Sequence, residues 1–239
     1  MGLFDRTLHS IPFVSFQTVL AKALAAVSYA ILVRSLPSSD MGGIGLMAGY
    51  LSILAIFALV PETVFVRDYT RIKGRLNEYI SSFLVFGGVR DGVMFLLGIP
   101  ILLYLALHYY PDQSLWVYFL LIQLSFYAGS VAGPFREAFY ASYRQARVAF
   151  VDSLMSFVGL GLIVFVFFTG DLLVYGGVQL AVSILTALAW FWTALLPLAF
   201  QFTLPKDWWA ITWKSITEFT LWNQTIGTVS RLLYQADIV

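Results

Sequence analysis

The sequence predicts an all-α polytopic membrane protein, and three observations lead to this fold class. Hydrophobic residues make up 60% of the 239-residue chain and charged residues only 11%, against about 25% charged residues in a typical soluble domain. The apolar residues form runs of about 20 or more, the length that an α-helix needs to cross a bilayer. Lys and Arg gather in every second connection between these runs, as in a membrane protein with a fixed orientation.

We expect seven membrane-spanning helices, because seven apolar segments have the required length. Strands of a membrane barrel are shorter and alternate in polarity, whereas helices satisfy their own backbone hydrogen bonds in lipid. The segments are 13–36, 42–66, 79–107, 113–134, 148–169, 173–200 and 216–239.

The distribution of basic residues predicts a cytoplasmic N-terminus. The first, third and fifth connections are short and poor in bases; they hold Asp40, Asp112 and Asp171. Arg6 falls on the same side as the basic connections, which are the second, fourth and sixth. These hold Arg67, Arg71, Lys73, Arg75, Arg136, Arg144, Arg147, Lys206 and Lys214.

Small residues and prolines predict details of the helix bundle. Three pairs of glycines have GxxxG spacing, which lets two helix backbones approach closely. Kinks are expected at prolines within or near the ends of spans. The glycine pairs are Gly45 and Gly49, Gly88 and Gly92, and Gly129 and Gly133, and the prolines are Pro61, Pro100 and Pro197.

Several function classes are excluded or disfavoured. The chain has no cysteine, so disulfides and thiolate chemistry are excluded. No sequence motif of a hydrolase, metalloprotease, nucleotide-binding or dinucleotide-binding site is present, and we expect neither a cofactor nor a metal. His9 and His108 are predicted on opposite membrane faces. The basic connections follow from membrane orientation, so they do not indicate nucleic-acid binding.

Ionisable residues within spans are costly and usually face the bundle interior. Because adjacent helix residues do not face each other, Arg90 and Asp91 are expected to have different partners. We predict a Lys22–Asp91 pair, at a similar height in the first and third helices, that leaves Arg90 free to bind an anion. Six ionisable residues within predicted spans are the candidates for such a role: Lys22, Glu62, Arg90, Asp91, Arg231 and Asp237.

Structural roles are the alternatives for these charges. Lys22 and Arg90 would then extend toward the cytoplasmic head groups, and Glu62 would pair with Arg67 or Arg71 near its helix end. Arg34, at the outer end of the first helix, is expected to be a structural anchor. Arg231 and Asp237 remain ion-pair or coupling candidates with Asp91 and Glu62.

The turn between the first two segments carries a family resemblance. AILVRSLPSSDMGGIGL resembles the "iaRxLgPxexGxy" signature of polysaccharide flippases, which are lipid-linked oligosaccharide exporters of the multidrug/oligosaccharidyl-lipid/polysaccharide superfamily. VPETVFVRDYTR, FREAFYASYRQARVAFVDSL and LLYQADIV are similar to later stretches of that family, although Pro61 stands near a position where the family often has Gly. The matching turn residues are Arg34, Leu36, Pro37, Asp40 and Gly42 or Gly43.

This resemblance implies a fold of two six-helix lobes around a central cavity that opens alternately to either side. Residues 1–202 would form the first lobe, 203–215 a cytoplasmic loop between lobes, and 216–239 the start of a second lobe, truncated here. The implied function is movement of a polyprenyl-phosphate-linked glycan from the cytoplasmic to the outer leaflet of a prokaryotic plasma or inner membrane. Arg90 and Lys22 would hold the phosphates, and glycan-assembly proteins would be partners.

Two alternatives remain open. A drug or metabolite exporter of the same superfamily would fit the fold, and a carboxylate in the first helix would favour it, whereas this helix has Lys22. A membrane-embedded glycan polymerase or ligase would need a large outer loop, but the outer connections are only a few residues long. A scaffold without transport activity is a third class, which mutation of Arg90 would distinguish.

Overall fold

The computed structural model describes residues 3–57, 59–109, 113–222 and 225–226. Every regular element within these ranges is helical, which confirms the all-α prediction. The α-helices are α1 (Leu3–Ser35), α2 (Ser38–Phe57), α3 (Val64–Ile72), α4 (Leu76–Tyr109), α5 (Gln113–Ser130), α6 (Gly133–Ala141), α7 (Gln145–Thr169), α8 (Leu172–Leu195) and α9 (Trp208–Ser215). Three short elements complete the fold: η1 (Pro61–Thr63), η2 (Lys73–Arg75) and η3 (Ile216–Thr220).

Five helical stretches in these described ranges are long and apolar enough to cross a membrane. Large apolar side chains are exposed along them; Leu97 of α4, Phe168 of α7 and Trp192 of α8 are each at least two-thirds exposed. Such an apolar exterior suits contact with lipid. The five stretches are Ser15–Ser35, Pro61–Tyr104, Leu115–Ala141, Gln145–Thr169 and Leu172–Leu195.

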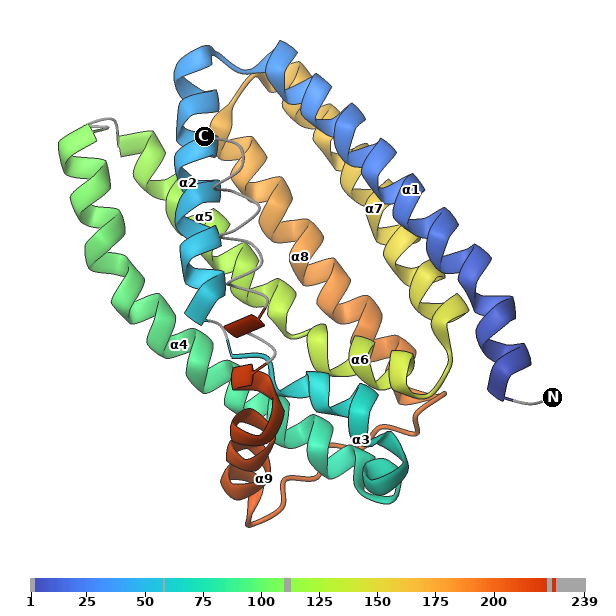
Figure 1. Ribbon diagram of the computed structural model, residues 1–239. Coiled ribbons are helices and arrows are strands. Elements are labelled where there is room, and N and C mark those ends of the chain that lie inside the picture. The colour runs from blue at the N-terminus through green and yellow to red at the C-terminus, as the bar shows by residue number, and fades with distance from the viewer. Residues whose placement is uncertain (1–2, 58, 110–112, 223–224, 227–239) are drawn as a thin grey trace.

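The long helices pack in a simple order. Helix α1 lies along α7, α7 lies beside α8, and α8 packs along α5, while α4 and α2 lie on the other side of α5 (Figure 1). The tight turns meet at one end of the bundle, where a Cβ added to Gly170 would lie 3.2 Å from the Ser35 carbonyl. Helices α3, α6 and α9 gather at the opposite end (Figure 1).

The expected continuous span over 42–66 is wrong. Helix α2 ends at Phe57, and the chain resumes as η1 at Pro61 before it enters α3. Proline suits the first position of a helical segment because its missing N–H is not needed there. The hydropathy of the sequence continues through this break, which is why the segment looked like one helix.

Two other expected boundaries are also wrong. The segment over 113–134 is divided, since α5 ends at Ser130 and α6 begins at Gly133, with Pro134 in its first turn. The expected loop over 203–215 contains α9. Of the prolines expected to cause kinks, Pro61 and Pro197 stand at helix ends, whereas α4 continues through Pro100.

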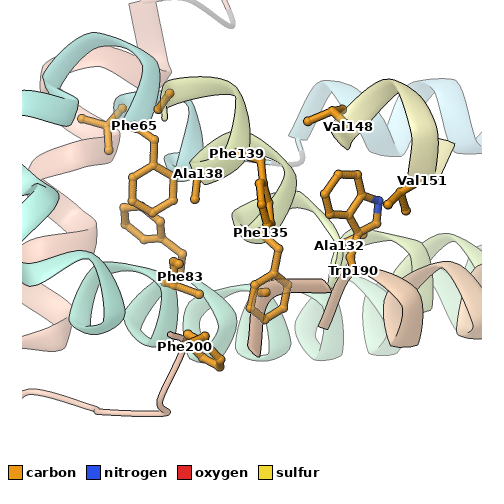
Figure 2. Packing of buried hydrophobic residues seen from close by; sticks show 14 of the residues in the cluster. Phe65, Phe83, Ala132, Phe135, Ala138, Phe139, Val148, Val151, Trp190 and Phe200 are labelled. Carbon is orange, nitrogen blue, oxygen red and sulfur yellow. The ribbon is translucent and has the colours of Figure 1, made fainter. Parts of the chain in front are cut away.

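The interior consists of two apolar clusters at the two ends of the bundle. The first joins α3, α4, α6, α7 and α8, and its aromatic members include Phe65, Phe83, Phe135 and Trp190 (Figure 2). The second joins α1, α2, α4, α5, α7 and α8 around Tyr118 and Phe119. Between and beside these clusters lie the polar groups described below.

Close helix contacts occur at glycines other than most of the predicted ones. Among the described residues, a Cβ added to Gly45, Gly49, Gly88 or Gly92 would meet no atom within 4 Å, so these four glycines make no close approach to another described helix. A Cβ added to Gly98 would instead overlap the side chains of Tyr50 and Gln123. This glycine brings α2, α4 and α5 together.

Candidate functional site

A polar cluster surrounds the break between α2 and η1. The break leaves carbonyl groups without helical partners, and each needs a donor when it is buried. The Leu59 carbonyl accepts a hydrogen bond from Arg90 Nη1 of α4. The Val60 carbonyl accepts from Thr63 Oγ1 at 2.9 Å and from Thr220 Oγ1 of η3 at 3.2 Å. Side chains from three elements therefore fix the break.

Arg90 and Asp91 pair with each other inside this cluster. Arg90 Nε lies 2.7 Å from Asp91 Oδ1, and the two side chains are only 11% and 10% exposed. Ser130, the last residue of α5, donates a hydrogen bond to Asp91 Oδ2. The prediction that these neighbours have different partners is wrong, because the long Arg90 side chain bends back along its own helix.

Glu62 is the second carboxylate of the cluster. It is 7% exposed, and its carboxylate lies over Gly133, where an added Cβ would be 2.5 Å from Oε1. Within the described structure it makes no ion pair within 4 Å, and the attraction that acts on it comes from Arg90. The alternative pairing with Arg67 or Arg71 is wrong, since both of those residues bind Asp68.

Glu62 and Arg90 both line a cavity of about 270 Å³ between η1, α4 and the α5–α6 junction. Ser130 also reaches this cavity. The remaining walls are apolar and are formed by Phe83, Leu84, Gly87, Gly88, Val131 and Pro134. The Arg90 guanidinium and the buried Glu62 carboxylate thus face a small, mostly apolar space.

A second and larger cavity, of about 560 Å³, forms a groove between α1, α7 and α8. Its α1 wall runs from Gln17 to Leu32, which corresponds to about 22 Å at a rise of 1.5 Å per residue. Its lining is rich in amide and hydroxyl groups. The polar residues of the wall are Gln17, Ser28, Tyr29, Ser156, Tyr175, Gln179 and Thr186, together with Arg136 and Asp152.

Arg136 and Asp152 form an ion pair at one end of this groove. Arg136 Nη2 lies 2.9 Å from Asp152 Oδ2, with side chains 43% and 15% exposed. The buried Nε of Arg136 makes no hydrogen bond to any residue in the described ranges.

Lys22 does not join either cluster. It is an exposed residue of α1, while its neighbour Ala21 lines the groove. Asp91 is held by Arg90 and Ser130, so the predicted Lys22–Asp91 pair is wrong. The height of Lys22 along its helix suggested a partner, but its direction around the helix axis turns it away.

The turn residues of the family resemblance lie at the α1–α2 junction. Arg34, Pro37 and Gly42 are exposed, and the Pro37 carbonyl accepts hydrogen bonds from the N–H groups of Asp40 and Met41, each at 3.1 Å. Gly43 rather than Gly42 is the tightly packed glycine, because its added Cβ would lie 2.8 Å from Leu115 Cδ2. These residues shape a turn and line neither cavity.

Sequence reasoning missed Arg136, Asp152 and Ser130. Arg136 was assigned to a basic connection because the α5 segment was expected to end before it. The Gly-Pro pair at 133–134 was the available signal, since Pro is favoured at the start of a helix. Arg231 and Asp237 lie outside the described residues.

The described residues contain no group of three His, Asp or Glu side chains that could hold a metal ion. Comparisons of the chain with protein-family models, with curated proteins and with solved structures found no match. The groove and the buried charges are accordingly the basis for inferring function.

Proposed function

We propose that this protein is a transporter that moves a polyprenyl-phosphate-linked glycan from the cytoplasmic to the outer leaflet of a prokaryotic plasma or inner membrane. The observation that supports this proposal most directly is the groove between α1, α7 and α8. Its volume of about 560 Å³ falls in the range of small-molecule binding sites, which is about 300–1,000 Å³. It lies among helices that are long and apolar enough to span a membrane.

The groove lining suits a sugar. Gln17, Gln179 and Tyr175 present amide and phenol groups along its walls, and these groups both donate and accept hydrogen bonds. Sugar hydroxyls need partners of this kind when they leave water, because an unpaired buried polar group is costly. The sugar would bind along the groove through such hydrogen bonds.

Arg136 suits the phosphate of the cargo better than Arg90 does. The donors of Arg90 are engaged with Asp91 and with the Leu59 carbonyl, whereas the Arg136 side chain is 43% exposed and lines the groove. A guanidinium binds phosphate oxygens well because its donors form a planar fork. On this proposal, release of Asp152 would free Arg136 for the phosphate.

The lipid chain of the cargo would bind next to the groove. An apolar cavity of about 450 Å³ lies between α1 and α7. Phe16, Leu20, Phe150 and Phe157 are among its lining residues. A polyprenyl chain would lie against this surface while the sugar occupies the polar groove.

Transport of a fluorescent polyprenyl-diphosphate-linked sugar in vesicles tests the proposal. An impermeant reductant bleaches only the outer leaflet, so the bleached fraction reports movement across the bilayer. We expect purified protein to raise this fraction above that of empty vesicles, and Gln179→Leu to abolish the increase. Gln201→Leu, at an exposed residue outside the groove, is the matched control and is expected to transport normally.

The same vesicles distinguish the second candidate function. The aromatic lining of the α1–α7 cavity would also hold a flat apolar cation, as a drug exporter requires. Movement of a cationic dye without movement of the glycan lipid would favour a drug exporter. Movement of neither cargo by folded protein would contradict transport.

A further inference from the structure

The break before η1 holds a buried carboxylate that the transport proposal does not use. Glu62 is 7% exposed and lines the 270 Å³ cavity. Its carboxylate lies over Gly133, where an added Cβ would be 2.5 Å from Oε1, and it makes no ion pair within 4 Å with a described residue. A buried carboxylate that faces a cavity without such an ion pair needs an explanation.

The ionisable groups around Glu62 would carry a net negative charge if all of them were ionised. The charged groups that act on it are Arg90 and Asp91 of α4 and Glu137 of α6. Arg90 is already bound to Asp91, so no described cation is left over for Glu62. An ionised carboxylate in apolar surroundings is costly without a compensating charge, and therefore the site requires a bound positive charge.

A metal cation does not fit this requirement. Sodium and similar hard cations need several oxygen ligands, but the nearby oxygens already accept or donate other hydrogen bonds. The Leu59 carbonyl binds Arg90, the Val60 carbonyl binds Thr63 and Thr220, and the Ser130 hydroxyl binds Asp91. The remaining cavity wall offers apolar side chains and glycines.

We propose that Glu62 is a proton-binding site, which exchanges its proton through the 270 Å³ cavity and controls the α2–η1 break. A cavity of this size with polar groups in its wall holds water, which is the proton acceptor. When the O–H bond of the Glu62 acid breaks, the proton passes to that water and the carboxylate keeps the electron pair. The carboxylate then attracts the Arg90 guanidinium away from the Leu59 carbonyl.

Proton binding by Glu62 does not depend on the proposed transport function, but a role for this proton in a transport cycle rests on that function. Movement of Arg90 would free the Leu59 carbonyl, which lies between α2 and η1, and would loosen the connection between these two elements. Proton uptake and release at Glu62 would in this way alter the packing of α2 on α4. Binding and release of a proton at Glu62 would therefore be one step of the transport cycle, whichever cargo is moved.

Infrared difference spectroscopy of the purified protein in lipid, recorded between acidic and alkaline buffer, tests the site. We expect a carboxylic-acid C=O band that disappears in Glu62→Gln and persists in Glu137→Gln, a half-buried acid on α6. Replacing sodium by choline at constant pH should leave the band unchanged. Gly133→Ala places a new Cβ against Glu62 Oε1 and should shift the frequency of the band. This variant tests the assignment of the band to Glu62 if Glu62→Gln does not fold.

Three results would overturn the proposal: a band that persists in Glu62→Gln, a band lost in Glu137→Gln instead, or a band that sodium removes at constant pH. The last result would mean a metal-cation site. The spectra contain no glycan. A protein that shows the Glu62 band but moves no glycan lipid would contradict the proposed cargo alone, and a transporting protein without the band would contradict the proton site alone.

Discussion

Asp91 holds the guanidinium of Arg90 from the next position of the same helix, with 2.7 Å between Arg90 Nε and Asp91 Oδ1. The pair is almost fully buried, and Arg90 also binds the carbonyl of Leu59 across the break in the chain. Through this hydrogen bond, the Arg90–Asp91 pair connects the middle of α4 to the break between α2 and η1.

Asp91→Asn should be strongly destabilising, because it leaves the buried charge of Arg90 without its counterion. Breaking a buried pair from one side typically costs about 3–5 kcal/mol, and a loss of this size is expected in the free energy of unfolding. Denaturant unfolding in detergent, followed by tryptophan fluorescence, measures it. Asp207→Asn removes only an exposed carboxylate and should change little; equal effects of the two substitutions would contradict the assignment.

Charge reversal between α1 and α4 should fail to restore function. Lys22 is exposed and Asp91 already has partners, so Lys22→Asp combined with Asp91→Lys places an unpaired lysine in the cluster. We expect transport in the double variant to be no better than in Asp91→Lys alone, and Lys22→Gln to behave as wild type. Rescue by the double variant would show that the two residues meet in another state.

Gly98→Ala and Gly92→Ala should have opposite effects on stability, although both change the same helix. The first adds a methyl group against Tyr50 and Gln123, and overpacking of this kind costs about 1–3 kcal/mol. The second adds a methyl group where no atom of a described residue lies within 4 Å and should stabilise α4 by about 0.5–1 kcal/mol. Unfolding in detergent compares them directly, and a destabilised Gly92→Ala would mean that this glycine has a contact in the folded protein.

The two single substitutions at the Arg136–Asp152 ion pair should lower the melting temperature by different amounts. Asp152 is the more buried partner, so Arg136→Gln leaves the worse unpaired charge and should lower the melting temperature more than Asp152→Asn does. The double variant has no unpaired charge and should recover part of the loss. A double variant that melts at the sum of the two single losses would show that the residues do not interact.

Ala199→Gly should stabilise the protein, because Ala199 has a positive φ of 47°. Left-handed backbone costs a non-glycine residue about 1 kcal/mol or more, and the change should recover up to about that amount. Ala181→Gly, in the interior of α8, should instead cost about 0.5–1 kcal/mol. Melting temperatures of the two variants give the sign, and a destabilising Ala199→Gly would contradict the strain.

The length and apolar character of the helices could be read from the sequence because both follow from the composition of each segment. The breaks do not change the apolar character of the chain, so Pro61 and the Gly133-Pro134 pair are the local signals for them. Height along a helix was also predictable, because it depends on residue number alone. The direction of Lys22 around α1 depends on how α1 packs against α7, and no local pattern sets that packing.

The candidate site was predicted in part. Glu62, Arg90 and Asp91 were recognised because charges are rare inside apolar segments, and the structure brings all three to one break. Their pairing was not predictable, since it depends on the conformation of the flexible Arg90 side chain. It also depends on Ser130, which lies in another helix, 39 residues after Asp91 in the sequence. Arg136 and Asp152 were missed because each lies near the end of an apolar segment, where charges are common.

The Arg90–Asp91 pair has a consequence for how the protein enters the membrane. Helices are inserted one after another as the chain is made, and a lone arginine at the centre of an inserting helix costs about 2.5–3.5 kcal/mol. Because the counterion of Arg90 is the next residue, both charges of the pair belong to one helix, and α4 needs no other helix to neutralise its arginine. A counterion on α1 would have required the two helices to find each other inside the lipid first.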